Sequence, residues 1–210
     1  MKKLDKIDFL IFDLGNVIID IDYDVSINEL KKILPSKKHH LTSQFFPSSF
    51  HKEYEKGLIS NEEFRNAVRD LYEENWSDDQ IDHVWNSLLI VVPQERLQLL
   101  SQLRQQYTTA ILSNTNDIHI VKFNEMLQEI SDYSSIHNLC DHVFLSHEMG
   151  LAKPDTAIYQ KVVTSLNTQA EKTIFFDDLA ANVEGAKKIG MNAVQITNSK
   201  ALMEFFGDVQ

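Results

Sequence analysis

Short apolar runs alternate with helical patterns along most of the chain. Residues 7–12 hold five large apolar side chains in six positions, and similar runs cover 108–112, 142–145 and 172–176. Continuous runs of this length are typical of strands buried on both faces of a parallel sheet. From residue 93 onward the runs alternate with helical patterns, and a last short run covers 192–197. This alternation predicts an α/β fold with a doubly wound parallel sheet.

Residues 18–92 show a helical pattern instead. Two capping boxes, Ser60 with Glu63 and Ser77 with Gln80, mark the starts of two helices. Apolar residues then recur at helical spacing as far as Leu89. We therefore predict a helical insert over 18–92, within a core formed by residues 1–17 and 93–210. The aromatic side chains of the insert are expected to form its interior and its contact with the core: Phe45, Phe46, Phe50, Trp76 and Trp85.

Two further helices are predicted within the core. Pro93 opens one, whose leucines at 97, 100 and 103 share a face. Residues 181–189 form the other, which Gly190 ends. Segment 118–140 is polar and irregular, and its pattern predicts no element.

Composition places the chain among ordinary globular proteins. It has 210 residues, of which 43% are hydrophobic and 24% charged. The single cysteine, Cys140, excludes an internal disulfide framework and is typical of a reducing cytoplasm. Acidic residues interrupt any apolar stretch near the N-terminus, so no signal peptide is predicted. The run from Leu88 to Val92 is too short to span a membrane. We expect a cytoplasmic protein without a membrane partner.

Net charge narrows the choice of partners. The chain carries a formal charge of −11, and its main basic cluster is Lys37-Lys38-His39-His40. A surface of this sign repels nucleic acid, so no nucleic-acid partner is expected.

The first candidate functional residue is Asp13, which directly follows the first apolar run. Ligands of open α/β sheets bind beyond the carboxyl ends of the strands. A carboxylate there is costly to desolvate unless a metal, a hydrogen-bond donor or a substrate meets it. The alternative is an aspartate that caps the following turn.

A second pair of carboxylates, Asp177 and Asp178, ends the run at 172–176. Adjacent like charges repel one another unless a cation lies near them. If the two strands are neighbours, three carboxylates meet in a small volume, and oxygen ligands of this kind suit Mg²⁺. The alternative is a pair of helix-capping aspartates.

Two other strand ends carry groups that suit a phosphate. The run at 108–112 leads to Ser113 and Asn114, whose hydroxyl and backbone N–H groups fit phosphate oxygens. Lys153 follows the run at 142–145 and could offset phosphate charge. Taken singly, the serine is more often a cap and the lysine a solvated surface charge.

These segments together resemble the four motifs of the haloacid dehalogenase superfamily, in their usual order and spacing. The motifs are Phe12-Asp13-Leu14-Gly15-Asn16-Val17-Ile18, Leu112-Ser113-Asn114-Thr115, Lys153-Pro154 and Phe176-Asp177-Asp178. The chain looks most like the sugar-phosphatase branch, which includes α-glucose-1-phosphate phosphatase. The resemblance implies a Rossmann-like core with strand order 5-4-1-2-3 and a helical cap of the C1 type at 18–92.

The resemblance also implies phosphoryl transfer through an aspartyl-phosphate on Asp13. Mg²⁺ would be held by the Asp13 and Asp178 carboxylates and the Gly15 carbonyl oxygen. Ser113, Asn114 and Lys153 would bind the transferring phosphoryl group. Asp177 would orient a metal-bound water molecule, and Asn182 would hold the metal-binding loop in place. The expected partner is a small-molecule phosphate ester. Because the net charge repels such an ester, the site needs cations of its own.

One position departs from the family pattern. Phosphatases of this superfamily usually carry a second aspartate two residues after the nucleophile, where this chain has Gly15. The chain is then a dehalogenase, a weak or inactive phosphatase, or a phosphatase whose ester has a good leaving group. Asp177 and Asp178 argue against a dehalogenase, which lacks this acidic pair. Candidate proton handlers in the cap are Asp20, Asp22, His51 and Glu55, unless these are only solvated surface groups.

Two functional hypotheses follow. The first is a Mg²⁺-dependent phosphatase of small sugar phosphates such as a hexose 1-phosphate, because an anomeric hydroxyl leaves with less help. The second is a non-catalytic or regulatory relative that binds a phosphorylated ligand. The sequence names neither the ester nor the oligomeric state, and it is compatible with a monomer.

Overall fold

A five-stranded parallel sheet forms the centre of the computed structural model, which describes residue 4 and residues 6–207. The strands lie in the order β5-β4-β1-β6-β7. If only these parallel strands are numbered along the chain, β1, β4, β5, β6 and β7 become strands 1 to 5. Read from β7 to β5, their order is then 5-4-1-2-3, as predicted. The prediction of an α/β fold is therefore confirmed. The strand bounds are β1 (Phe9–Phe12), β4 (Thr108–Ser113), β5 (His142–Leu145), β6 (Thr173–Asp177) and β7 (Asn192–Gln195).

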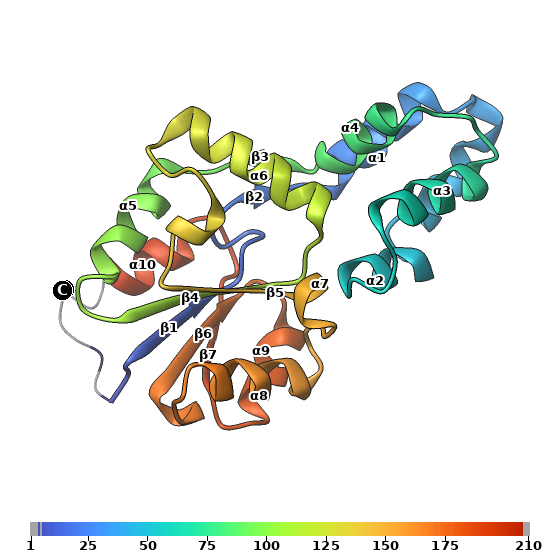
Figure 1. Cartoon of the computed structure of the whole chain (residues 1–210). Coiled ribbons are helices and arrows are strands. Elements are labelled where there is room, and N and C mark those ends of the chain that lie inside the picture. The colour runs from blue at the N-terminus through green and yellow to red at the C-terminus, as the bar shows by residue number, and fades with distance from the viewer. Residues whose placement is uncertain (1–3, 5, 208–210) are drawn as a thin grey trace.

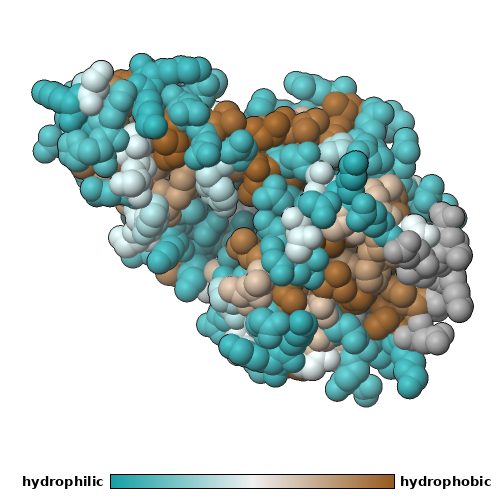
Figure 2. All heavy atoms as spheres, turned by 180° about the vertical axis from the view of Figure 1, so that it is seen from behind, coloured by the Kyte–Doolittle hydropathy of each residue, from teal (hydrophilic) through white to brown (hydrophobic). Residues whose placement is uncertain are grey.

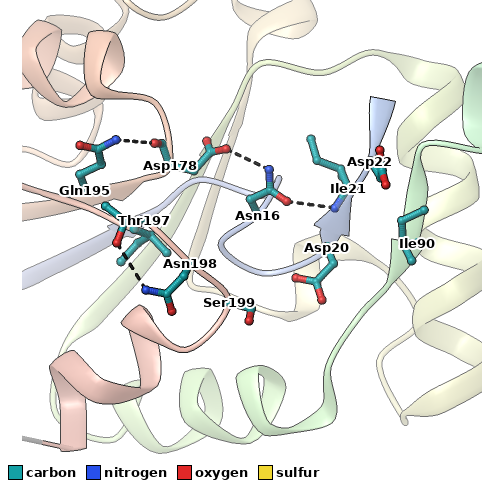
Figure 3. Close-up of a pocket in the computed structure, with 11 residues that line it drawn as sticks. Asn16, Asp20, Ile21, Asp22, Ile90, Asp178, Gln195, Thr197, Asn198 and Ser199 are labelled. Atoms are coloured by element: carbon teal, nitrogen blue, oxygen red, sulfur yellow. Dashed lines mark hydrogen bonds between the residues drawn. The ribbon is translucent and has the colours of Figure 1, made fainter. Parts of the chain in front are cut away.

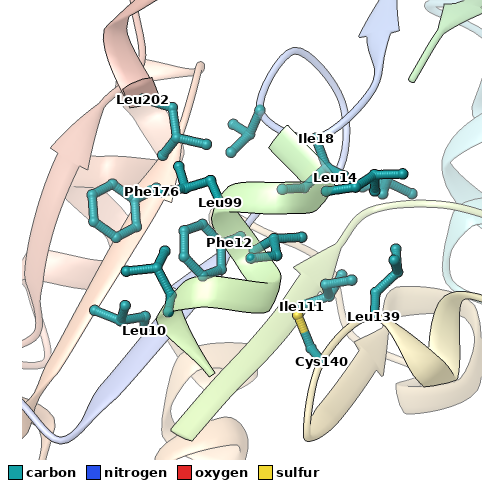
Figure 4. Close-up of a cluster of buried hydrophobic side chains, with 14 of the residues drawn as sticks. Leu10, Phe12, Leu14, Ile18, Leu99, Ile111, Leu139, Cys140, Phe176 and Leu202 are labelled. Atoms are coloured by element: carbon teal, nitrogen blue, oxygen red, sulfur yellow. The ribbon is translucent and has the colours of Figure 1, made fainter. Parts of the chain in front are cut away.

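Helices cover both faces of the sheet (Figure 1). One face packs against α5 (Gln94–Leu103), α6 (Asp117–Ile130) and α10 (Ala201–Gly207), and the other against α8 (Thr156–Ser165) and α9 (Ala180–Lys187). Side chains of β1 alternate between the two faces because successive residues of a strand point in opposite directions. Leu10 and Phe12 join the first cluster (Figure 4), whereas Ile11 joins the second. The short elements α7 (Ser146–Met149), η2 (Ile136–Asn138) and η3 (Ala170–Lys172) lie in the connections.

The helical insert has a hydrophobic cluster of its own, centred on the fully buried Trp85. Both predicted capping boxes are present, at the starts of α3 and α4. The five aromatic residues all belong to this cluster or pack against it, as predicted. Seen from behind, the insert and the core form two lobes, and the insert is covered largely by hydrophilic side chains, whereas the core shows both hydrophilic and hydrophobic ones (Figure 2). The elements of the insert are α1 (Tyr23–Ile33), η1 (Ser36–Gln44), α2 (Ser49–Glu55), α3 (Asn61–Tyr72) and α4 (Asp78–Asn86).

The insert is not helical throughout, which corrects the prediction for 18–92. The chain leaves the core as β2 (Asp20–Ile21) and returns as β3 (Leu89–Val91), and the two pair antiparallel. Ile18 and Ile19, placed in the insert by pattern, are buried in the hydrophobic cluster of the core. The domain division at 17/18 and 92/93 stays a prediction. Residues 1–3, 5 and 208–210 of the predicted core lie outside the described part of the chain.

Segment 118–140, for which the sequence pattern gave no prediction, holds all but the first residue of the 14-residue helix α6. Asn116 caps this helix by accepting a hydrogen bond from His119 N, and Phe123 and Leu127 bury its inner face. Ile118 joins the cluster of the insert instead, so α6 touches both lobes. Within the described residues, no helix combines the length and apolar character needed to cross a membrane.

Candidate active site

Three carboxylates meet at the carboxyl end of the sheet. Phe12 of β1 is paired with Phe176 of β6, so the residues that follow them, Asp13 and Asp177, lie side by side. Asp13 N donates a hydrogen bond of 2.8 Å to Phe176 O, which extends this pairing by one residue. Oxygen atoms of Asp13, Asp177 and Asp178 all lie within 4.8 Å of one another. The parallel register therefore brings together carboxylates that are 164 and 165 positions apart in the sequence.

Lys153 bridges two of these carboxylates. Its Nζ lies 2.7 Å from Asp13 Oδ1 and 2.7 Å from Asp177 Oδ2, and it donates to Leu112 O at 3.0 Å. The lysine side chain is only 1% exposed, so its charge is compensated by these partners rather than by water. The Asn114 side chain fixes the Lys153 backbone, because Asn114 Oδ1 accepts from Lys153 N and Asn114 Nδ2 donates to Lys153 O.

The cluster holds more negative than positive charge. Burial raises the pKa of Asp13 to about 7, although Lys153 counteracts the shift. Burial also raises the pKa of Asp178. The pKa of Lys153 is raised as well, because its two carboxylate partners outweigh the effect of burial. Three carboxylates against one ammonium leave a surplus of negative charge, so the donor set fits a hard divalent cation.

Asp177 differs from the other two carboxylates in being fully enclosed by donors. Its Oδ1 accepts from Leu179 N and Asn182 Nδ2, and its Oδ2 accepts from Lys153 Nζ and Asn182 Nδ2. The residue is 0% exposed. Asp13 and Asp178 are therefore better placed than Asp177 to offer oxygen atoms to an ion.

Asn16 links Asp178 to the connection with the insert, a role that the sequence analysis missed. Its Nδ2 donates to Asp178 Oδ2 at 3.0 Å, while its Oδ1 accepts from Ile21 N at 3.1 Å (Figure 3). Asn16 has a φ of 55°, in the left-handed region that asparagine tolerates better than most residues. An asparagine directly after Gly15 was the available signal. Beside this contact lies an open polar cavity of about 520 Å³, lined in part by Asp20, Asp22 and Asp178.

A second cavity, of about 60 Å³, lies where the insert meets the core. From the core it is lined by Gly15, Ser113, Asn114 and His119, and from the insert by a mostly aromatic and ionisable set: Tyr23, Phe46, His51, Glu55 and Trp85. The structure thus places Ser113, Asn114 and Gly15 on one cavity wall. Tyr23 and His119 were not singled out from the sequence, because only the fold brings them to this place.

The insert is fastened to the core beside this cavity. Ser146 Oγ accepts a hydrogen bond from Thr115 N at 2.9 Å and donates to the backbone carbonyl of Glu55, at the end of α2. Ile118 N donates to the Tyr54 hydroxyl at 3.4 Å. These contacts hold α2 against the loop that follows Ser113, the last residue of β4, and begins with Asn114.

The four candidate proton handlers separate into two groups. Asp20 pairs with the buried Arg96 at 2.8 Å, and Asp22 caps α1 by accepting from Asp24 N. Both therefore have structural partners at the base of the insert. His51 and Glu55 instead pair with each other at 3.3 Å and face the cavity that Gly15 lines.

Comparison with known proteins agrees with this geometry. The chain matches the haloacid dehalogenase-like hydrolase family over residues 7–190. It is 25% identical to a D-ribitol-5-phosphate phosphatase of Bacteroides thetaiotaomicron, over 90% of this chain and 91% of that protein. A HAD-family enzyme of the same organism, crystallised with magnesium and inorganic phosphate, is 33% identical with a TM-score of 0.80, covering 90% of this chain and 93% of that one. A predicted HAD-like hydrolase from Porphyromonas gingivalis is 24% identical with a TM-score of 0.87, covering 97% and 98%, and shows the shared fold.

Proposed function

Because the chain belongs to the haloacid dehalogenase-like hydrolase family, we propose that it is a Mg²⁺-dependent phosphatase of small sugar or sugar-alcohol phosphates. The hexose 1-phosphate expected from the sequence is one member of this class. The D-ribitol-5-phosphate phosphatase relative extends the class to phosphorylated polyols. The solved relative that holds magnesium and inorganic phosphate supports both the metal and the phosphoryl group.

One observation carries the proposal: the Asp13 carboxylate is buried and held at 2.7 Å by the Lys153 ammonium. This contact fixes Asp13 in one orientation at the end of β1. The same ammonium would offset the charge of a phosphoryl group that approaches Asp13. A carboxylate and a cation placed in this way suit nucleophilic attack on phosphorus.

The residues present fit a magnesium ion. The carboxylates of Asp13 and Asp178, with the backbone carbonyl of Gly15, would hold it, and hard oxygen donors of this kind are those that Mg²⁺ prefers. When bound, the ion would supply positive charge that lowers the repulsion between a carboxylate nucleophile and a phosphate dianion.

Residues of the chain itself carry out the attack on phosphorus and bind and position the reacting groups. Asp13 attacks phosphorus, the bond between phosphorus and the ester oxygen breaks, and that oxygen takes up a proton and leaves as the alcohol. Ser113 Oγ and Asn114 N–H bind oxygens of the transferring group. Asp177 and Asn182 hold Lys153 in position. A water molecule then attacks phosphorus and releases Asp13 as the free carboxylate.

A panel of phosphate esters, assayed with and without Mg²⁺, tests the proposal. The wild type should release phosphate from sugar or polyol phosphates only with the metal. Asp13→Asn should abolish turnover without loss of fold, since asparagine has nearly the same shape but is a poor nucleophile. Asp8→Asn is the matched control, because this aspartate is exposed at the other end of the same strand.

Two outcomes would contradict the proposal. Phosphate binding without turnover of any ester would favour the non-catalytic alternative. Activity of Asp13→Asn within tenfold of wild type would exclude Asp13 as the nucleophile.

A further inference from the structure

An alkyl phosphate releases a basic alkoxide unless a proton reaches the ester oxygen. General acid catalysis of this kind contributes roughly 10²–10⁴-fold to the rate. Gly15 has no side chain that could supply this proton. Lys153 does not supply it either, because its ammonium already donates to Asp13, Asp177 and Leu112 O.

His51 and Glu55 form a pair that can hold a transferable proton. They lie one turn apart on α2, with His51 Nε2 3.3 Å from Glu55 Oε1. His51 Nδ1 lies 2.5 Å from the carbonyl oxygen of Phe46, which can only accept. Both ring nitrogens therefore face oxygen acceptors. Nδ1 must carry a hydrogen, and the contact with Glu55 needs a second one on either the imidazole or the carboxyl group.

Surrounding contacts hold this pair in place at the cavity. The His51 ring packs edge-on against Trp85, with ring centroids 5.0 Å apart. Ser146 of the core anchors the Glu55 backbone. The side chains are 14% and 24% exposed, so they are shielded but still accessible from the cavity that Gly15 and Ser113 line.

The other ionisable side chains that line this cavity, among the described residues, are unsuited to the role. Burial raises the pKa of Tyr23 to about 12, so its hydroxyl is too weak an acid to donate its proton readily near neutral pH. Burial lowers the pKa of His119 to about 4, so its ring is neutral. For His51, burial lowers the pKa, but the hydrogen bond to Glu55 and the charge of that residue outweigh burial and raise it.

We propose that the His51–Glu55 pair of the insert donates the proton to the leaving group, in place of a side chain at Gly15. The inference rests on the proposed phosphatase function. As Asp13 attacks phosphorus and the bond to the ester oxygen breaks, the proton shared by His51 Nε2 and Glu55 Oε1 passes to that oxygen. In the second step a water oxygen attacks phosphorus, its proton returns to the pair, and the bond between phosphorus and Asp13 breaks.

Esters with different leaving groups test the inference. We would measure kcat/KM on a polyol phosphate, whose alkoxide needs a proton, and on 4-nitrophenyl phosphate, whose phenolate leaves without one. His51→Gln and Glu55→Gln should each lower kcat/KM on the polyol phosphate by roughly 10²-fold or more. The same variants should change kcat/KM on 4-nitrophenyl phosphate by less than about tenfold. Glu53→Gln, on the exposed side of the same helix, should change neither.

A rescue experiment separates proton donation from a structural role. Gly15→Asp should restore turnover of the polyol phosphate in the His51→Gln protein, because it places an acid on the same cavity wall. The new Cβ would meet only Ile21, with the nearest atom, Cδ1, at 2.9 Å, and the end of that flexible side chain can move aside. Thermal melts check that each variant folds.

The outcomes distinguish the two proposals. Equal losses on both esters, or no loss on the polyol phosphate, would overturn the role of the pair and leave the phosphatase function intact. A folded double variant without rescue would likewise overturn it. A wild type that hydrolyses neither ester with Mg²⁺ would overturn the phosphatase function and this inference with it.

Discussion

Gly57→Ala, which adds one methyl group, should lower catalytic activity by more than its loss of stability explains. It follows α2 with a φ of 64°, in the left-handed region. A Cβ at this position would lie 2.0 Å from the backbone carbonyl oxygen of His147, in α7 of the core. Because the obstacle is backbone, it cannot rotate away, and Gly57→Ala must push the end of α2 from the core.

The size of the effect follows from the contact. A Cβ normally keeps about 3.4 Å from such an atom, so the gap must widen by more than 1 Å. α2 carries His51 and Glu55, which would move by a similar amount away from Ser113. A misplacement of about 1 Å can reduce catalysis on the order of 10²-fold. The left-handed backbone itself adds roughly 1–2 kcal/mol of strain for alanine.

Gly150→Ala is the matched control for that strain. Gly150 has a φ of 68°, and a Cβ there would meet nothing within 4 Å. Both variants should lose a few degrees in Tm, at roughly 2–4 °C per kcal/mol for a chain of this size. Only Gly57→Ala should also lose about 10²-fold in kcat/KM on a polyol phosphate. If the two variants kept activities within threefold of each other, the contact between α2 and α7 would not position the cavity wall.

Three further perturbations test the site and its surroundings. Asp178→Ala should weaken Mg²⁺ binding in calorimetric titrations more than Asp177→Ala does, because the oxygens of Asp177 already accept hydrogen bonds from protein donors. A larger loss of Mg²⁺ affinity in Asp177→Ala would mean that Asp177, rather than Asp178, binds the ion. Lys153→Met should abolish turnover and destabilise the fold by about 3–5 kcal/mol in urea unfolding, since it leaves buried carboxylates unpaired, and an unchanged midpoint would contradict this. For His119 the folded-state pKa of about 4 lies below the ordinary value of 6.5, so the stability that the neutral ring contributes is complete above pH 6.5 and is lost as the pH falls towards 4, by at most about 3.4 kcal/mol. His119→Phe should reduce the pH dependence of the unfolding free energy between pH 4 and 6.5. An unaltered dependence would mean that another group is responsible for it.

Much of the site could be predicted because parallel strands bring their carboxyl ends to one edge. Asp13, Ser113 and Asp177 each end or follow an apolar run, and the structure gathers them at that edge. What the sequence could not show were contacts between side chains from distant segments. The hydrogen bonds between Asn114 and Lys153 join residues 39 positions apart, and no local pattern records them.

The insert was predicted less completely, for a different reason. A strand of two or three residues, such as β2 or β3, is too short to show an alternating pattern. Helix α6 divides its apolar side chains between two lobes, with Ile118 in one and Phe123 in the other, which weakens a single-face signal. The pairing of His51 with Glu55 fits helical spacing, but only the fold shows that it faces Gly15.

The antiparallel pairing of β2 with β3 makes the insert exchangeable. Ile21 and Leu89 are direct partners, so the chain enters and leaves the insert at adjacent points about 5 Å apart. A two-residue turn suffices to join such partners. The parallel sheet and the three carboxylates would keep their backbone framework if the segment between these points were replaced by another. A different insert can therefore replace this one during evolution without a change in the strand order of the sheet. A protein engineer can exchange the insert at the same two positions.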